Sequence, residues 1–161
     1  MTSYEPRMGD YGVVRTGGFF GKLIRLGTIS RWNHAFIYVG DGNIVEANPT
    51  GVAISPVSKY PNIAWNQHES ILLEQRLAVV NYAKLTVGRP YNFLVIISIA
   101  LRILGLKLLA NNKTLHRISQ HDGYICSELV AEAYRRASVP LFDKPDDQVT
   151  PGDLAERLIY Q

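Results

Sequence analysis

Cysteine is almost absent from this sequence: the chain of 161 residues contains one, Cys126. A single cysteine excludes an intramolecular disulfide, so secretion is neither required nor excluded. The sequence also lacks any run of lysine or arginine, and its formal net charge is only +3. We therefore expect no nucleic-acid partner, whereas the mild positive charge suits an anionic surface such as a cell wall or lipid headgroups.

Several sequence motifs are missing as well. No glycine-rich dinucleotide motif follows a strand and no P-loop is present, so we expect no cofactor. The histidines and acidic residues do not have the spacing of a metal site, so we expect no metal. The segment MTSYEPRMGDYG lacks the apolar region of a signal peptide, and we expect a cytoplasmic or a phage- or virion-associated protein.

The composition is that of a globular protein. Hydrophobic residues make up 47% of the chain and charged residues 19%, which separates it from disordered sequences. The length fits one domain with a sizeable core, and neither a repeat nor a low-complexity linker divides it. We therefore treat residues 1–161 as a single domain.

The order of the predicted elements is strands first and helices later, which predicts an α+β fold. The sheet should be antiparallel, either open or partly closed into a barrel, and packed against helices. Alternating or β-rich patterns predict strands over 11–16, 34–48 (a hairpin around Asp-Gly), 51–57 and 69–75. Helical patterns cover 18–27 (or a turn), 76–89, 93–110, 122–137 with Asp122 as N-cap, and 150–160 with Thr150 as N-cap.

The segment 93–110 is nearly continuous apolar sequence, FLVIISIALRILGLKLLA. As a helix it would extend about 27 Å, close to the thickness of a bilayer core. Arg102 and Lys107 interrupt it, and Ser98, Arg102 and Gly105 fall on one stripe. We favour a core helix with one polar edge, with an interfacial helix and a membrane-spanning helix as alternatives, so contact with a membrane surface stays open.

The position of Cys126 gives the first indication of function. It begins the helical pattern CSELVAEAYRR, in which Leu129 and Ala133 continue an apolar stripe that starts at Ile125. One interpretation is a small buried hydrophobic residue. The other is a nucleophile, because N–H groups and the positive dipole end at a helix N-terminus favour a thiolate and can bind a developing oxyanion.

A catalytic thiolate needs an imidazole nearby, and His34 is the best candidate. It begins the strand HAFIYVG, whereas His68, His116 and His121 lie in polar stretches. A third group should orient the imidazole. If residues 40–42 form a three-residue hairpin loop, Phe36 pairs with Glu46, and Glu46 then shares a face with His34 and can take this role, with Asn48 as the alternative.

These residues resemble a known family. HAFIYVGDGNIVEA, followed downstream by YICSELV, resembles the circularly permuted branch of the NlpC/P60 (papain-like) cysteine hydrolases. This branch includes YiiX-like bacterial proteins and lecithin:retinol acyltransferase-like proteins, and a glutamate at position 46 is typical of the YiiX-like group. The resemblance covers roughly residues 8–155 and includes the turn GRPYNF.

The resemblance implies a permuted papain-like fold and a cysteine peptidase or amidase without a cofactor. Its catalytic residues would be Cys126 as nucleophile, His34 as base and Glu46 as orienting residue. The substrate would be an amide in a cell-wall peptide. The alternatives are hydrolysis or transfer of a lipid or other acyl group, and a non-catalytic binding module with the same fold. Residues expected to bind the oxyanion or substrate are Tyr91, Tyr124, Asn33 and Asn48.

Overall fold

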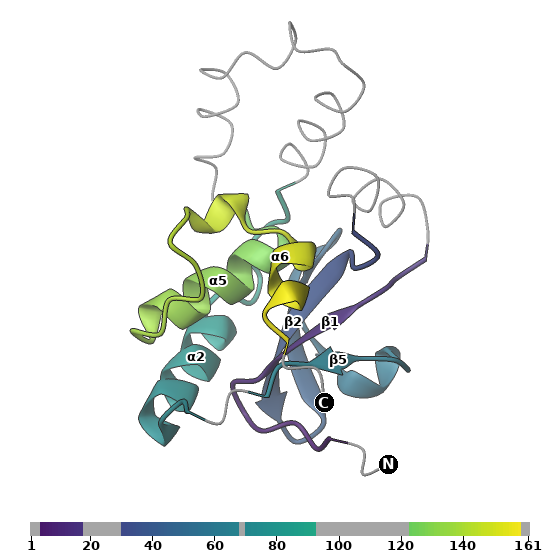
Figure 1. Cartoon of the computed structure of the whole chain (residues 1–161). Coiled ribbons are helices and arrows are strands. Elements are labelled where there is room, and N and C mark those ends of the chain that lie inside the picture. The colour runs from purple at the N-terminus through teal and green to yellow at the C-terminus, as the bar shows by residue number, and fades with distance from the viewer. Residues whose placement is uncertain (1–3, 18–29, 68–69, 93–122, 159–161) are drawn as a thin grey trace, which may run out of the picture.

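The structure is a computed structural model that describes residues 4–17, 30–67, 70–92 and 123–158 (Figure 1). The elements predicted for 18–27 and 93–110, and the histidines His68, His116 and His121, lie outside these ranges. Within them, no helix is long and apolar enough to cross a membrane.

A five-stranded antiparallel sheet forms the centre of the protein, in the order β4-β3-β2-β1-β5. β4 and β5 are its edges, so over the described ranges the sheet is open and not closed into a barrel. Together with the helices, it confirms the predicted α+β class. The strands are β1 (Tyr11–Val14), β2 (His34–Gly40), β3 (Asn43–Asn48), β4 (Gly51–Pro56) and β5 (Ala64–Trp65).

The β2–β3 hairpin reaches the predicted pairing by an unpredicted route. Phe36 stands opposite Glu46, as predicted. The turn has only two central residues, Asp41 and Gly42, with φ of 52° and 71°, which replace the predicted three-residue loop. A register shift in β2 just before the turn compensates for the missing loop residue. Phe36 pairs with Glu46 and lies two residues after His34 in β2. Glu46 therefore stays on the same face as His34.

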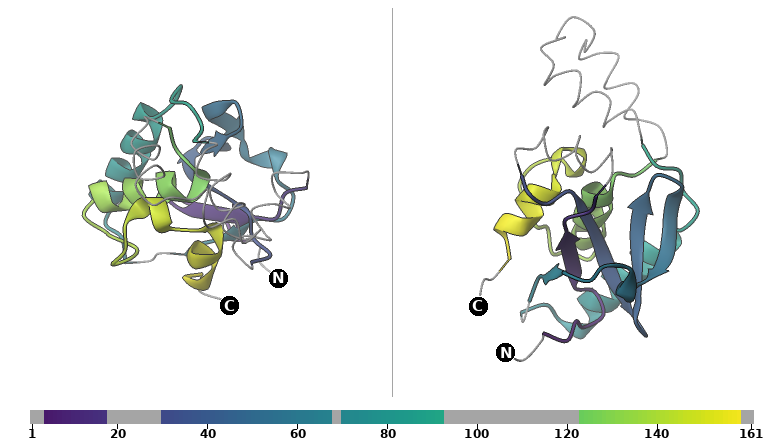
Figure 2. Two further views of the ribbon diagram at one scale, coloured as in Figure 1. Left: turned by 90° about the horizontal axis from the view of Figure 1, so that it is seen from above. Right: turned by 90° about the vertical axis from the view of Figure 1, so that its right-hand side faces the viewer.

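Three helices cover one face of the sheet (Figures 1 and 2). α5 lies against β2 and β3, α2 packs beside α5 against β2, and α6 lies against β1 and α5. Strong helix formers and two arginines in the last turn favour α5, since cations stabilise a helix C-terminus. The bounds are α2 (Leu73–Leu85), α5 (Cys126–Arg136) and α6 (Pro151–Glu156), with 3-10 turns η1 (Val57–Lys59) and η2 (Asp146–Gln148).

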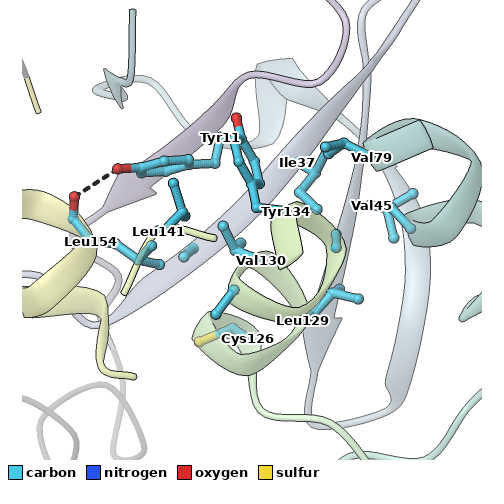
Figure 3. Packing of buried hydrophobic residues seen from close by; sticks show 14 of the residues in the cluster. Tyr11, Ile37, Val45, Val79, Cys126, Leu129, Val130, Tyr134, Leu141 and Leu154 are labelled. Carbon is cyan, nitrogen blue, oxygen red and sulfur yellow. Dashed lines mark hydrogen bonds between the residues drawn. The ribbon is translucent and has the colours of Figure 1, made fainter. Parts of the chain in front are cut away.

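The main core lies between these helices and the sheet (Figure 3). Leu129 and Val130 of α5 are fully buried there. The Tyr134 ring meets the edge of Tyr11 with 5.7 Å between ring centroids, and the Tyr11 hydroxyl donates a hydrogen bond of 2.9 Å to the Leu154 carbonyl. Buried tyrosines with paired hydroxyls thus join β1 to α5 and α6.

A second, smaller cluster covers the opposite face of the sheet. Phe36 is its centre: it stacks on Tyr60 with 5.2 Å between ring centroids and meets the edge of Trp65 at 5.7 Å. The segment that follows β4, which includes η1 and β5, supplies these covering rings. This segment becomes important for the site because it passes beside Glu46.

Two predicted elements need correction. The strand expected over 69–75 is wrong, because α2 already begins at Leu73; the Gln75 side chain accepts a hydrogen bond of 3.0 Å from the Leu72 N–H and caps the helix. The helix around Cys126 has Ile125 as its N-cap and not Asp122. The predicted N-cap Thr150 of α6 is confirmed, since its hydroxyl accepts a bond of 3.1 Å from an N–H in the first turn.

A buried ion pair fixes α2 to the start of β1. Arg76 contacts the fully buried Asp10 carboxylate at 2.7 Å and also donates to the Met8 carbonyl. The Tyr4 hydroxyl donates a further bond of 2.6 Å to Asp10. Burial of this carboxylate is tolerated only while its partners remain, because an unpaired buried charge is costly.

We therefore expect Arg76→Met to lower the free energy of unfolding by about 3–5 kcal/mol in chemical denaturation. The matched control is Arg136→Met, which removes an arginine from an exposed pair with Glu132 on α5 and should change stability little. Equal effects of the two substitutions would contradict a structural role for the buried pair.

Candidate functional site

The N-terminus of α5 is held firmly where Cys126 begins the helix. The backbone of Ile125 is extended, and its N–H donates a bond of 3.2 Å to the Glu128 carboxylate. The Ser127 hydroxyl donates a buried bond of 2.5 Å to the Val149 carbonyl, next to α6. The first N–H groups of a helix have no acceptor within the helix. The thiol therefore lies beside backbone donors whose position the surrounding structure fixes.

The His34 side chain interacts with both Glu46 and Cys126. His34 starts β2, and its Nε2 lies 2.7 Å from Oε2 of Glu46 on β3. The Cys126 thiol lies near the same imidazole, close enough for its interaction with His34 to raise the pKa of the ring. Because Nε2 contacts the carboxylate, Nδ1 is the ring nitrogen left for a further partner. All three side chains are shielded from water: Cys126 is 2% exposed, His34 8% and Glu46 0%.

The Glu46 carboxylate is saturated with hydrogen bonds. Oε2 receives His34 and the Tyr60 hydroxyl, the latter at 2.5 Å. Oε1 receives the Ser55 hydroxyl at 2.6 Å and the Lys59 ammonium at 2.5 Å. Each oxygen thus has two donors, which explains how a carboxylate can be ionised inside an apolar sheet face.

The pKa shifts agree with this geometry. Burial would lower the pKa of His34, but the hydrogen bonds and charges of Cys126 and Glu46 outweigh it and raise the pKa to about 9. Burial would raise the pKa of Glu46, but its bonds to His34, Lys59, Ser55 and Tyr60 place that pKa well below the usual range. At neutral pH the arrangement therefore favours a carboxylate beside an imidazolium.

The four other predicted site residues have different surroundings. Burial raises the pKa of Tyr91, and a charge on Cys126 raises it further. Tyr91 therefore lies near the sulfur. Tyr124 pairs with Tyr91 in a parallel bridge, but its hydroxyl lies 2.8 Å from that of Tyr82, outside the triad.

The two asparagines make local structural bonds. The Asn33 amide bonds to the backbone and hydroxyl of Thr16 and connects the ends of β1 and β2. Asn48 accepts bonds from the N–H and hydroxyl of Thr50 in the β3–β4 turn. Of the residues predicted beyond the triad, Tyr91 alone is shown within electrostatic reach of the thiol.

Sequence reasoning missed the three additional partners of Glu46. Ser55 had a signal: Glu46 pairs with Ala53, so a hydroxyl two positions further along β4 is its diagonal neighbour on the same face. Lys59 and Tyr60 had none, because they follow Pro56 in a short 3-10 turn whose direction no periodic pattern indicates.

Comparison with known proteins gives a structural match and no match by sequence. No family model and no curated protein matches the chain. Among solved structures, the chain is similar to the crystal structure of metalloprotein yiiX from Escherichia coli O157:H7, DUF1105. The TM-score is 0.59 at 20% sequence identity, over 83% of this chain and 67% of that one. At this identity the likeness concerns the fold, which is YiiX-like.

That structure is named as one of a metalloprotein, but the residues at the site described above have few atoms left to bind a metal. Glu46 has both oxygens occupied by four donors, and Nε2 of His34 is bound to it. This leaves one sulfur and one ring nitrogen, fewer than the three or four protein ligands of a typical zinc site. Within the described ranges no three His, Cys, Asp or Glu side chains form a group that could hold a metal ion. The residues described around Cys126 therefore do not fit a metal.

The raised pKa of His34 predicts a pH dependence. By NMR titration, the native imidazole should change protonation near pH 9, whereas histidines of the denatured chain titrate near 6.5. Stabilisation by the imidazolium is complete below about pH 6.5 and is lost as pH rises through about 9. The stability difference between the wild type and His34→Gln should therefore shrink over that interval. A native midpoint at or below 6.5 would contradict the arrangement.

Proposed function

We propose that the protein is a cysteine hydrolase that works through a thioester acyl-enzyme, with Cys126 as nucleophile, His34 as its proton partner and Glu46 as the orienting residue. One observation supports this most directly. A thiol at a helix N-terminus, an imidazole and a saturated buried carboxylate come together, although they belong to three elements of the fold. A packing cysteine requires none of these partners.

The reaction would proceed in two halves. The Cys126 thiolate attacks the substrate carbonyl, and the oxyanion is bound by N–H groups of the first turn of α5. The His34 imidazolium then gives its proton to the departing amine or alcohol, which leaves a thioester on the sulfur. Water loses a proton to the neutral imidazole and attacks the thioester, and the acid product and the thiolate are released with His34 protonated again.

Glu46 serves this cycle through His34. Its negative charge stabilises the imidazolium, and its bond to Nε2 holds the ring in one orientation and leaves Nδ1 free to exchange a proton with the thiol. The residue acts by positioning and does not contact the reacting atoms, so its loss should slow turnover without removing the nucleophile.

For the substrate we favour an amide in a cell-wall peptide, as the family resemblance implies. The alternative, an acyl ester or amide of a lipid, arose from the apolar segment 93–110, which lies outside the described residues. A non-catalytic binding module is the third interpretation. Reactivity of the thiol separates the third from the first two, and a substrate series separates the first two from each other.

The first test is the reactivity of the thiol. At neutral pH iodoacetamide should alkylate native Cys126 about tenfold faster than the denatured chain, because free thiols are only a few per cent ionised there. His34→Ala should remove most of this advantage. Because the thiol is 2% exposed, the reagent must enter the site to react with it. A native rate no higher than the denatured rate would indicate a structural cysteine.

The second test is turnover on peptidoglycan fragments and on acyl esters of increasing chain length. Cys126→Ala should abolish activity, and Glu46→Gln should reduce kcat on the order of 100-fold while circular dichroism stays unchanged. Activity that rises with acyl length, with none on wall peptides, would refute the peptide substrate and support the lipid alternative.

A further inference from the structure

The segment just after β4 contributes two charged or polar groups to the site that the mechanism above does not use. Lys59, at the end of η1, and Tyr60, directly after it, both bind Glu46 at 2.5 Å. Tyr60 is also packed against the imidazole, with 5.5 Å between its ring centroid and that of His34. One short turn therefore contacts both the orienting carboxylate and the histidine that it orients.

We propose that Lys59 and Tyr60 are positioning residues, which hold the Glu46 carboxylate in place and limit how strongly it attracts the proton of His34. The inference rests on the proposed function for its effect on turnover. Its effect on the histidine does not need a substrate and can be measured independently.

The first step of the argument is geometric. Glu46 is fully buried, and its side chain could rotate away from His34 unless its other lone pairs were satisfied. Tyr60 donates to Oε2, the same oxygen that His34 contacts, while Lys59 donates to Oε1 beside Ser55. These bonds fix both oxygens of the carboxylate at once and so fix the plane in which the imidazole binds.

The second step is electrostatic. A carboxylate that already neutralises an ammonium and accepts a phenol hydrogen has less negative charge to offer the imidazole. The Tyr60 pKa is raised by burial and by its bond to Glu46, so the phenol remains a donor. Lys59 has a half-exposed side chain, and this weakens its influence without removing it. Both residues should therefore keep the imidazolium acidic enough to protonate a leaving group.

The titratable groups around His34 come from four parts of the chain. α5 supplies Cys126, β3 supplies Glu46, and the turn after β4 supplies Lys59 and Tyr60. Tyr91, which precedes α5 in the chain, lies within reach of the Cys126 charge. Of these groups, Lys59 is the cation nearest to Glu46, so its removal gives the clearest electrostatic change.

The experiment measures the His34 titration by NMR in single variants, together with kcat. Lys59→Met should raise the His34 midpoint by about one pH unit, and Tyr60→Phe should raise it by less, because each change leaves more carboxylate charge for the imidazole. Both variants should lower kcat about tenfold and shift the alkaline limb of its pH profile to higher pH. Lys59→Arg keeps the positive charge and should leave the His34 midpoint at its wild-type value.

Matched controls separate these effects from general ones. Tyr38→Phe removes a hydroxyl from the same sheet face, where it accepts a bond from Gly42 and does not contact Glu46. Lys84→Met removes an exposed lysine from α2. Neither control should move the His34 midpoint or kcat. If Tyr60→Phe does not fold, Ser55→Ala removes the smallest donor to Glu46 and should still raise the midpoint.

An unchanged His34 midpoint in Lys59→Met and in the folded Tyr60 or Ser55 variant would overturn the proposal, even if the protein is a hydrolase. Shifted midpoints in a protein with no turnover on any substrate would support the positioning role and count against the hydrolase. The two claims can therefore fail separately.

Discussion

The site depends on a carboxylate that the fold keeps ionised away from water. Glu46 lies on a sheet face lined by aromatic rings, where an unpaired charge would cost several kcal/mol. Four donors satisfy it, and they come from β2, β4 and the turn after β4. The position of the His34 imidazole, and through it the state of the thiol, follows from this one satisfied charge.

The two faces of the sheet have different roles in building the site. On one face, aliphatic residues and paired tyrosines pack α5 so that its N-terminus reaches the start of β2. On the other, Phe36 and Tyr60 stack and close the space around Glu46. His34 lies at the start of β2, where it contacts Glu46 on the aromatic face and comes near Cys126 at the start of α5.

Much of this could be predicted from the sequence because it depends on local patterns. The hairpin, the helix that begins at Cys126 and the α6 cap each have a clear periodicity or capping residue. The pairing of Phe36 with Glu46 was predicted from a three-residue loop, whereas the structure uses a two-residue turn and a bulge. The predicted face of Glu46 is therefore correct although the predicted turn is wrong. The shorter turn and the bulge have opposite effects on the register, and the sequence pattern does not reveal either of them separately.

What the sequence did not predict depends on non-local geometry. Lys59 and Tyr60 reach Glu46 only because Pro56 ends β4 and a 3-10 turn brings the chain back over the sheet. The apolar residues before Gln75 resemble a strand, yet they lead into α2, where the buried pair of Asp10 and Arg76 decides the packing. At the first place no local pattern indicates the turn, and at the second the Gln75 cap and a tertiary ion pair favour a helix over the strand-like pattern.

The central claim is that Cys126 carries an acyl group during turnover. The most direct measurement is intact-protein and peptide mass spectrometry after incubation with an acyl donor or cell extract and rapid acid quenching. The account predicts an adduct on the peptide that contains Cys126, lost in Cys126→Ala and greatly reduced in His34→Ala. Substrate turnover without any adduct on that peptide, or an adduct that forms equally well without His34, would contradict it.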